Sequence, residues 1–521
     1  MYHPNLQTVA AVVRFHAERR PDATAVVCDG RRRSYAELHR ESNRIAHAIA
    51  DAGLPPGARV AYLGKESEHY YEIFFGCAKG GTVLVPINWR LAAGEVEHIL
   101  RDSGSELLFV EDALLGVAEK VRPRLPRLAT LVVLGSAAGD GLAAWLAGHP
   151  QTEPPPLPGS GPQDPVIQLY TSGTTGRPKG VVLAQRSFFR IRDALAGAGL
   201  DWIDWRDGDV SLIGLPGCHV GGIWWAMQGF AAGVTNVAMP SFDSAGAVRL
   251  IRELGVTTAC VVPSMLRLML AEPGVSRADF ATVRKIVYGG SPIAESLLRE
   301  ALEVIGAAFA QSYGLTETGN TAICLPPADH VPGSPRMRAA GRPYPGVRVK
   351  VVDATGLPVA TGEVGEVCLH TPASMVEYWG LAEATQRTLV DGWIHTGDAG
   401  YLDRAGYLYI CDRIQDMIIV AGEMIYPAEI ENVLTKHPAV ADAAVIGVPD
   451  DRFGEAVHAF VAVRPGHQVG PRDLMLFLVD RIAAFKIPSR FDFVAAVPRN
   501  PSGRIQRREL REQFRHGRQV S

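Results

Sequence analysis

The sequence predicts an α/β protein with a large N-terminal domain of several parts and a small C-terminal unit of α+β structure. Short apolar runs alternate with amphipathic segments, which favours mostly parallel sheets flanked by helices. The 521 residues also exceed the size at which a single hydrophobic core keeps growing. A new series of strand and helix patterns begins at about residue 413. We therefore expect one domain at residues 1–412 and a second at residues 413–521.

The N-terminal segments support this reading. Residues 58–63 (ARVAYL) and 82–86 (TVLVP) are short apolar runs bounded by Gly or Pro, as in buried strands. Residues 34–37 (SYAE) form a capping-box pattern that predicts the start of a helix. Residues 153–165 are rich in Pro and Gly and predict a connector, and residues 166–170 (VIQLY) predict a strand that enters a glycine-rich loop.

Two types of β structure are expected further along. Residues 256–262 and 285–288 read as buried parallel strands, whereas 347–353 and 365–370 indicate antiparallel strands of a small barrel. In the C-terminal unit we expect strands at 417–420, 440–448 and 457–463, and helices at 427–436 and 471–481.

Composition excludes several function classes. The net charge of −3 gives no reason to expect nucleic acid as a partner. The seven cysteines are dispersed without a CxxC pair, so no zinc site is expected, and reduced thiols in a cytoplasmic protein are favoured. There is no signal-peptide pattern and no apolar run of about 18 residues, so we expect no transmembrane segment.

The strongest motif lies at residues 170–180, which read YTSGTTGRPKG. Glycines allow a backbone to approach phosphates, hydroxyls add donors, and a lysine adds a point charge. The spacing differs from a Walker A loop, and the density of hydroxyls and glycines argues against a mere flexible hairpin. The candidate phosphate-binding residues are Thr171, Ser172, Gly173, Thr174, Thr175, Gly176 and Lys179.

This loop and later segments, in the same order along the whole chain, resemble the signatures of the adenylate-forming enzymes, which include acyl-CoA synthetases, adenylation domains and luciferases. Residues 289–292 (GGSP) are similar to the segment that forms the adenine wall, and residues 311–317 (QSYGLTE) are similar to the adenine-stacking and magnesium motif. The resemblance implies that Tyr313 stacks on adenine, Thr316 contacts the α-phosphate and Glu317 holds Mg²⁺. It also assigns nucleotide contacts to Gly289, Gly290, Ser291, Gln311, Ser312, Gly314 and Leu315.

The resemblance continues into the C-terminal unit. Residues 392–398 (GWIHTGD) resemble the ribose motif, which implies that Asp398 accepts hydrogen bonds from the ribose, that Arg413 donates to it, and that Ile410 lies at the nucleotide. Residues 412–431 resemble the hinge, at about 413–416, and the thiolation loop. In the family the small domain is a mobile lid, and a loop equivalent to Gly422 and Glu423 comes to the site when the pantetheine thiol attacks.

The acyl pocket is expected at residues 216–225 (PGCHVGGIWW). His219 occupies the family's gate position, although a histidine among apolar residues is equally well a packed core residue. Val220 stands where amino-acid-activating relatives carry an aspartate, which disfavours an amino-acid substrate. Gly221 and Gly222 remove side-chain bulk, and Trp224 and Trp225 are expected to wall an apolar cavity. We expect a hydrophobic carboxylic acid as substrate, fatty, aromatic or polycyclic.

One departure from the family pattern bears on mechanism. The lysine that bridges the attacking carboxylate and the α-phosphate in relatives is replaced by Arg504. A planar guanidinium cannot reproduce a compact ammonium, and losing one well-placed transition-state contact costs about 10²–10³ in rate. Gln415 stands where lysine or aspartate is usual, and Met424 stands where the segment usually reads GEN.

These residues predict an acyl-CoA ligase that works through an acyl-adenylate, with ATP, CoA and Mg²⁺ as cofactors. Arg504 leaves three alternatives open: a complete synthetase, an enzyme that only converts a preformed acyl-AMP supplied by a separate adenylating ligase, or a non-catalytic acyl-adenylate-binding protein. A carrier-protein thiol is an alternative acceptor to CoA. Catalysis needs no side-chain nucleophile, because acyl-AMP is already an activated anhydride.

Overall fold

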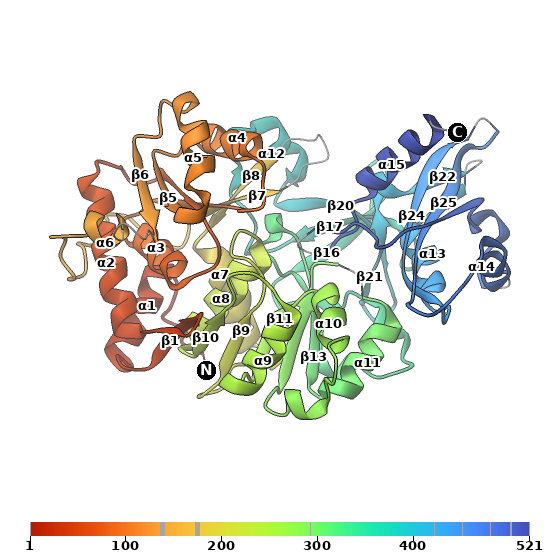
Figure 1. Ribbon diagram of the computed structural model, residues 1–521, viewed down its shortest axis with the longest axis horizontal. Coiled ribbons are helices and arrows are strands. Elements are labelled where there is room, and N and C mark those ends of the chain that lie inside the picture. The colour runs from red at the N-terminus through yellow and green to blue at the C-terminus, as the bar shows by residue number, and fades with distance from the viewer. Residues whose placement is uncertain are drawn as a thin grey trace.

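The computed structural model describes residues 2–135, 141–171, 178–291, 293–420, 423–450, 452–479, 481–500 and 503–519. Two large sheets and their helices form the N-terminal part, and a smaller unit lies beside it at the other end of the molecule (Figure 1). This arrangement matches the α/β fold class predicted from the alternation of apolar runs and amphipathic segments.

The first large sheet has nine strands in the order β15-β14-β13-β12-β11-β9-β10-β1-β2. Its middle strands are parallel, whereas β2, β14 and β15 pair antiparallel at the two edges. The strands are β1 (Thr24–Cys28), β2 (Arg31–Ser34), β9 (Val210–Ile213), β10 (Thr235–Ala238), β11 (Thr258–Val261), β12 (Lys285–Gly289), β13 (Ala308–Tyr313), β14 (Ile323–Leu325) and β15 (Arg342–Pro343).

The second large sheet has seven strands in the order β18-β8-β7-β4-β3-β5-β6. Its parallel strands include the two early apolar runs, and β7 and β8 form an antiparallel pair that flanks the glycine-rich motif. The strands are β3 (Arg59–Leu63), β4 (Val83–Ile87), β5 (Leu107–Glu111), β6 (Thr130–Leu134), β7 (Pro165–Thr171), β8 (Lys179–Ala184) and β18 (Glu377–Tyr378).

The two sheets share one hydrophobic core. Helices α3 (Glu68–Lys79) and α8 (Val220–Ala232) are buried along nearly their whole length, and their side chains belong to the same cluster as residues of both sheets. Helix α2 begins with the predicted capping box of Ser34 and Glu37. The helices of this part are α1 (Val9–Arg19), α2 (Tyr35–Asp51), α3, α4 (Ala93–Ser103), α5 (Leu115–Val121), α6 (Gly141–Trp145), α7 (Arg186–Gly197), α8, α9 (Ser244–Leu254), α10 (Pro263–Leu270), α11 (Glu295–Ile305) and α12 (Ala382–Thr388).

The region expected to form a small barrel is a five-stranded antiparallel sheet. Its long strand β20 carries the ribose motif and pairs on one edge with β21, which leads into the C-terminal unit. The strands are β16 (Arg348–Val352), β17 (Gly365–His370), β19 (Leu389–Val390), β20 (Trp393–Leu402) and β21 (Leu408–Arg413).

The C-terminal unit has its own core, because two separate hydrophobic clusters contain only residues between Ile418 and Phe514. The expected helices at 427–436 and 471–481 end earlier, at Leu434 and Leu478, and the strand expected to end at 448 runs to Asp450. Its elements are β22 (Ile418–Val420), β23 (Glu423–Ile425), α13 (Pro427–Leu434), β24 (Val440–Asp450), β25 (Gly454–Val463), α14 (Pro471–Leu478), β26 (Arg490–Phe493) and α15 (Arg507–Gln519). In the described part of the chain, no helix combines the length and apolarity that crossing a bilayer requires.

Candidate active site

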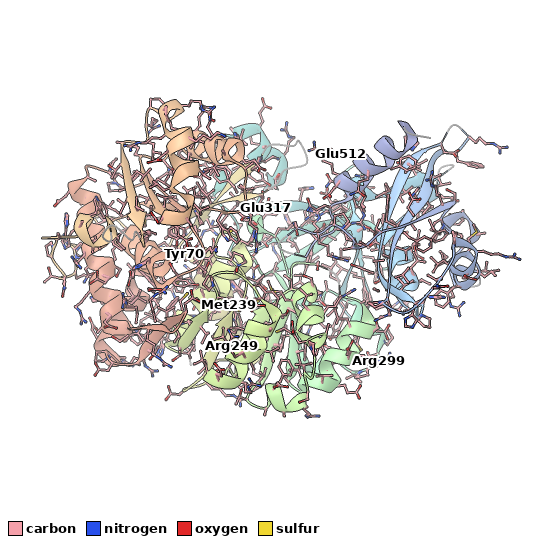
Figure 2. All side chains as sticks on the ribbon, in the orientation of Figure 1. Tyr70, Met239, Arg249, Arg299, Glu317 and Glu512 are labelled. Carbon is pink, nitrogen blue, oxygen red and sulfur yellow. The ribbon has the colours of Figure 1, made fainter. Side chains whose placement is uncertain are left out.

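The predicted nucleotide residues gather where the parallel strands β12 and β13 end. In open α/β sheets this edge forms the binding crevice. Gly289 closes β12 and must lack a side chain, because a Cβ there would lie 2.2 Å from the Ser312 carbonyl oxygen of β13. Gly290 follows with a φ of +80°, which favours glycine. Figure 2 shows Glu317, the residue assigned to Mg²⁺, near the middle of the molecule.

Tyr313, Asp398 and Arg413 form one hydrogen-bonded cluster around the buried carboxylate of Asp398. The Tyr313 hydroxyl donates to Asp398 Oδ2 at 2.7 Å, and Arg413 Nε lies 2.7 Å from Asp398 Oδ1. Arg413 also donates through Nη1 to the Thr396 carbonyl at 2.7 Å. The structure therefore brings together the three residues that sequence comparison assigned to adenine and ribose, although they come from β13, β20 and β21.

The Asp398 carboxylate is buried, so it depends on hydrogen bonds from neighbouring groups in place of water. Burial raises its pKa above the ordinary value, while the charge of Arg413 and the hydroxyl of Tyr313 oppose that rise. Tyr313 and Arg413 satisfy one lone pair on each carboxylate oxygen, and the remaining lone pairs can accept hydrogen bonds from the two hydroxyls of a ribose.

Glu317, Tyr378 and Lys179 form a second cluster beside the first. Glu317 lies in the single 3₁₀ turn Thr316–Thr318, and its Oε1 accepts a 2.6 Å hydrogen bond from the Tyr378 hydroxyl. Lys179 Nζ lies 4.9 Å from the centre of the Tyr378 ring. The carboxylate of Glu317 suits Mg²⁺ and the ammonium of Lys179 suits the phosphates that such an ion accompanies, so the residues present fit a magnesium–phosphate site.

The two ends of the predicted phosphate loop lie on neighbouring strands. Thr171 at the end of β7 pairs in register with Lys179 at the start of β8, so the loop connects two adjacent strand ends. The predicted residues Ser172, Gly173, Thr174, Thr175 and Gly176 lie outside the described residues, as do Pro292 and the thiolation-loop residue Gly422.

Several other predicted nucleotide residues have their polar groups engaged within the protein. Gln311 Oε1 accepts from the Tyr288 hydroxyl at 3.0 Å, and the Ser312 hydroxyl donates to Thr321 at 2.8 Å. The Leu315 amide donates to Thr318 at 2.8 Å and thereby caps the turn that carries Thr316 and Glu317. Ile410 packs at the edge of the main core, and Gly314 lies so close to Asn320 that a Cβ would meet its carbonyl oxygen at 2.1 Å.

A tight turn of the C-terminal unit carries Arg504 to the nucleotide residues. Asn500 and Arg504 exchange hydrogen bonds of 2.8 Å, and Arg499 Nη1 donates to the Gly503 carbonyl at 2.7 Å. Gly503 has a φ of +80° and lies against Ser291, whose Oγ would be 3.4 Å from a Cβ at this position. The turn therefore lies next to Ser291 of the predicted adenine wall.

The guanidinium of Arg504 lies in a field of mixed charge. It is 3.7 Å from Asp416, a carboxylate that also accepts a 3.2 Å hydrogen bond from Arg511. Burial and then the nearby charge of Arg413 lower the Arg504 pKa, while Asp416 and Asp398 oppose this. Of the other two departures from the family pattern, the Gln415 side chain is exposed, and the Met424 side chain lies outside the described residues.

The predicted acyl-pocket residues divide into two groups. His219 precedes α8, burial lowers its pKa to about 4, and its Nε2 has no hydrogen-bond partner among the described residues. Val220 and Gly221 are partly exposed beside it, and a Cβ at Gly221 would meet only Leu215 and Asn320, at 3.4 and 3.6 Å.

Gly222 and the tryptophans have structural surroundings that the sequence reading did not anticipate. A Cβ at Gly222 would lie 2.3 Å from the Pro216 carbonyl oxygen, so this glycine permits a close backbone approach instead of widening a pocket. Trp224 and Trp225 are 4% and 1% exposed, and the Trp225 indole donates to the Leu212 carbonyl at 3.1 Å. Both are packed core residues in this structure.

Sequence reasoning missed a buried carboxyl group behind the gate segment. Glu66 accepts from the Tyr71 hydroxyl at 2.5 Å and from the Gly217 amide at 2.8 Å, and burial raises its pKa to about 7. Its only sequence signal was its place two residues before the apolar helix α3, which begins at Glu68. A small cavity adjoins it, lined by Tyr62, Gly64, Glu66, Tyr70, Pro86, Ile87, Trp89, Pro216 and Cys218.

Comparisons with known proteins cover nearly the whole chain. A model described as AMP-binding enzyme matches residues 13–379, and one described as AMP-binding enzyme C-terminal domain matches residues 429–504. A fatty acid–[acyl-carrier-protein] ligase, ScoC of Streptomyces coeruleorubidus, is 64% identical, with 99% of this chain and 98% of that protein covered.

Two further similarities are more distant. The long-chain-fatty-acid–CoA ligase FadD13 of Mycobacterium tuberculosis is 36% identical, with 93% of each chain covered. The crystal structure of ATP-bound MatB from Rhodopseudomonas palustris has a TM-score of 0.89 and 29% identity, with 98% of this chain and 99% of that chain covered.

Proposed function

Because the chain belongs to the family of AMP-binding enzymes and is a ligase, we propose that it joins a fatty acyl group, through acyl-AMP, to the thiol of a phosphopantetheine arm. The observation that carries this proposal is the Tyr313–Asp398–Arg413 cluster beside Glu317 and Lys179. It supplies an aromatic ring, a ribose acceptor, a metal ligand and a phosphate-binding cation within one crevice.

The nucleotide takes a defined place in this proposal. Tyr313 stacks on adenine. Asp398 accepts hydrogen bonds from the ribose hydroxyls, and Arg413, which is paired with Asp398, donates to the ribose. Thr316 contacts the α-phosphate, and Glu317 holds Mg²⁺, which neutralises phosphate charge when it is bound. The loop that begins at Thr171 and ends at Lys179 binds the phosphates.

The acyl group extends from the α-phosphate toward the gate segment at His219. The pKa of His219 near 4 keeps its imidazole neutral at physiological pH, which suits an apolar acyl chain. A Cβ at Gly221 would only just contact Leu215 and Asn320, so this glycine leaves room for little more than a methyl group beside the gate. A hydrophobic carboxylic acid is therefore the proposed substrate, and the relatives that act on fatty acids by name support this choice.

Arg504 determines which half of the reaction is efficient. The turn that carries it lies beside Ser291, and in this proposal the Arg504 side chain reaches the α-phosphate from there. A lysine at that place would put a compact charge between the carboxylate and the α-phosphate, whereas the guanidinium is wider, planar and already shared with Asp416. Adenylation is therefore slow in our proposal, and thioester formation from acyl-AMP is unaffected.

A slow first half-reaction implies a supply of acyl-AMP, so a separate adenylating ligase is the proposed partner. The alternative is a complete synthetase in which Arg504 substitutes for lysine. A third alternative, a protein that binds acyl-AMP without catalysis, would show neither half-reaction. The mobility of the 413–521 unit about residues 413–416, and a cytoplasmic location, are parts of the same proposal.

The two half-reactions separate these alternatives. Pyrophosphate release from ATP and a medium-chain fatty acid measures adenylation, and thioester formation from synthetic acyl-AMP measures transfer. We expect transfer to be faster than adenylation by about 10²-fold or more. Equal rates would support the complete synthetase, and adenylation without transfer would contradict the proposal.

The thiol that accepts the acyl group belongs either to free CoA or to a carrier protein. Free CoA and a holo-carrier protein present the same thiol, and the 64% identical relative is named for a carrier protein. We propose the carrier protein as the preferred acceptor. With both acceptors at equal concentration and acyl-AMP as donor, acyl-carrier protein should be the main product, whereas predominant acyl-CoA would assign the CoA-ligase function.

A further inference from the structure

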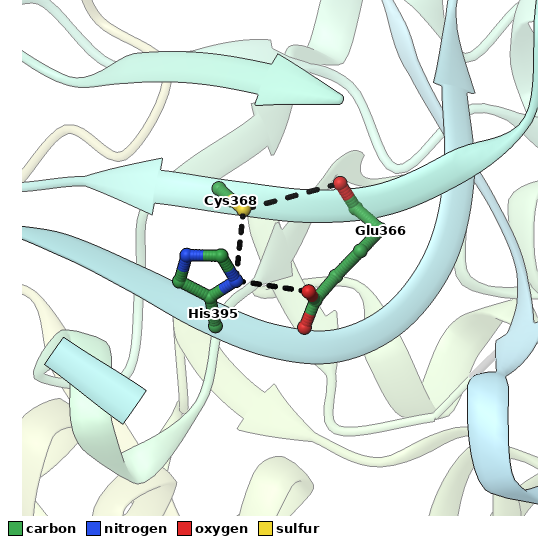
Figure 3. A group of neighbouring side chains, drawn as sticks. All are labelled: Glu366, Cys368 and His395. Atoms are coloured by element: carbon green, nitrogen blue, oxygen red, sulfur yellow. Dashed lines mark hydrogen bonds and ion pairs between the residues drawn. The ribbon is translucent and has the colours of Figure 1, made fainter. Parts of the chain in front are cut away.

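Three side chains outside the nucleotide cluster converge on one point between strands β17 and β20. They are Glu366, Cys368 and His395, and their ligand atoms all lie within 4.8 Å of one another (Figure 3). His395 Nδ1 lies 2.9 Å from Glu366 Oε2 and 3.5 Å from Cys368 Sγ. Within the described part of the chain, this is the one such group of three His, Cys, Asp or Glu side chains.

The spacing of sulfur and imidazole nitrogen matches a tetrahedral site, whereas the 2.9 Å between His395 Nδ1 and Glu366 Oε2 is shorter than the about 3.4 Å expected of two such ligands, so the carboxylate has to turn when an ion binds. Zn²⁺ binds thiolate at about 2.3 Å and imidazole nitrogen at about 2.0–2.1 Å, which puts the two ligand atoms about 3.5 Å apart in tetrahedral geometry. Sγ and Nδ1 are separated by 3.5 Å here. The thiol gains little from its present neighbours, because its other contact, to the Glu366 carbonyl oxygen, is 4.0 Å long.

We infer that Glu366, Cys368 and His395 form a binding site for a borderline-soft divalent ion of the Zn²⁺ type, with water as the fourth ligand. The ligand set of one thiolate, one imidazole and one carboxylate is that of such ions. Cys368 is fully buried, whereas the Glu366 and His395 side chains are each 25% exposed, so an ion can enter from their side. Cys368 and His395 lie opposite each other on paired strands, which holds both ligands in place.

Binding requires defined proton movements. The thiol loses its proton to solvent when sulfur binds the ion, and His395 takes the tautomer that carries its proton on Nε2, so that the Nδ1 lone pair faces the ion. Lys350 lies opposite Cys368 on β16, and its Nζ is 4.6 Å from the centre of the Trp393 ring. Burial and the Glu366 carboxylate raise the pKa of the Cys368 thiol to about 12, and the positive charge of Lys350 offsets only part of this rise, so the thiol keeps its proton until an ion binds.

The ion would also act on the nucleotide site. Glu366 Oε1 accepts a 3.1 Å hydrogen bond from the Gly397 amide, one residue before Asp398. A carboxylate that turns toward an ion loosens this bond and the position of Asp398. Zn²⁺ and AMP should therefore weaken each other's binding by the same factor, because coupling between two sites is reciprocal. This second part alone rests on the proposed nucleotide site.

Co²⁺ provides a direct test, because a cobalt–thiolate bond gives a charge-transfer absorption band. The full-length protein, first stripped with a chelator, should develop this band with one equivalent of Co²⁺ and lose it when Zn²⁺ is added. Cys368→Ser should abolish the band, and Glu366→Gln should weaken Co²⁺ binding about tenfold or more. Cys411→Ser is the matched control, since Cys411 is a partly buried thiol on the adjacent strand β21 that lies outside the group, and it should keep the band.

Absence of the band in the wild-type protein, or its persistence in Cys368→Ser, would overturn the site. AMP affinity measured by calorimetry should fall about fivefold or more when Zn²⁺ is present, and only in the protein that retains Cys368. Equal AMP affinity with and without Zn²⁺ would overturn the coupling. If AMP fails to bind in both conditions, the proposed function fails while the cobalt band still decides the ion site.

Discussion

The hydroxyl of Tyr313 donates a 2.7 Å hydrogen bond to the carboxylate of Asp398, which lies 85 residues further along the chain. The residue assigned to adenine therefore positions the residue assigned to ribose. Both oxygens of Asp398 have partners, since Arg413 binds the other one. The nucleotide cluster is organised before a ligand arrives, which lowers the entropic cost of binding.

Asp398→Asn should weaken AMP binding by about 10- to 150-fold, because hydrogen bonds to a charged group contribute about 1.5–3 kcal/mol. Tyr313→Phe keeps the ring for stacking and removes the hydroxyl only, so AMP affinity should fall far less. Calorimetric titration with AMP measures both. Glu383→Gln, at an exposed position on α12, is the control. Unchanged AMP affinity in Asp398→Asn would contradict the assigned ribose contact.

The adjacent glycines of the gate segment should respond differently to alanine. A Cβ at Gly222 meets the Pro216 carbonyl at 2.3 Å, so Gly222→Ala should lower the melting temperature by several degrees, despite the better helix propensity of alanine. Gly221→Ala should leave the melting temperature unchanged, because the neighbours of the new Cβ lie at 3.4 Å or beyond. The added methyl group beside the gate should raise KM for long acyl chains. The reverse order of melting temperatures would show that the close approach at Gly222 is not required.

Glu66 makes stability depend on pH. Burial raises its pKa from the ordinary value of 4.5 to about 7, so the folded protein holds this proton more tightly than the unfolded chain. Its contribution to stability is full below pH of about 4.5 and is lost as pH rises through about 7, a change of at most about 3 kcal/mol. Glu66→Gln should therefore reduce the fall in melting temperature between pH 5 and pH 8, the window of about 2–3 units that this shift defines.

The neighbouring Glu68 provides a control, because its pKa is shifted in the opposite direction. Burial by itself would raise the pKa of Glu68, but hydrogen bonds from Arg31 hold it below the ordinary value. Glu68→Gln should lower the melting temperature at pH 8, where the wild-type carboxylate is charged and paired. If Glu66→Gln shows the same pH dependence as the wild type, Glu66 does not hold a proton near neutral pH.

Local sequence patterns predicted much of the fold for physical reasons. Buried strands need continuous apolar runs, and the runs at 58–63 and 285–288 are strands β3 and β12. A helix start needs a side-chain acceptor for its free amides, and the Ser34 capping box provides it. The strand predicted at 166–170 also lies as expected, because it is part of β7, which leads directly into the phosphate motif.

Contacts between residues far apart in the chain could not be predicted from local sequence patterns. The bond from Tyr378 to Glu317 spans 61 residues, and the bond from the Gly217 amide to Glu66 spans 151. The convergence of Cys368 and His395 depends on strand register, so a search for closely spaced cysteines missed it. Gly222 was read as space for substrate, but only the folded backbone reveals that Pro216 fills that space.

The central claim is that the guanidinium of Arg504 slows adenylation and spares thioester formation, and Arg504→Lys tests it most directly. Pyrophosphate release from ATP and fatty acid should increase at least about tenfold in this variant, because a compact ammonium recovers a transition-state contact. Thioester formation from synthetic acyl-AMP should stay the same. Arg508→Lys, at an exposed position on α15, is the matched control. An unchanged rate of pyrophosphate release in Arg504→Lys, with transfer intact, would contradict the account.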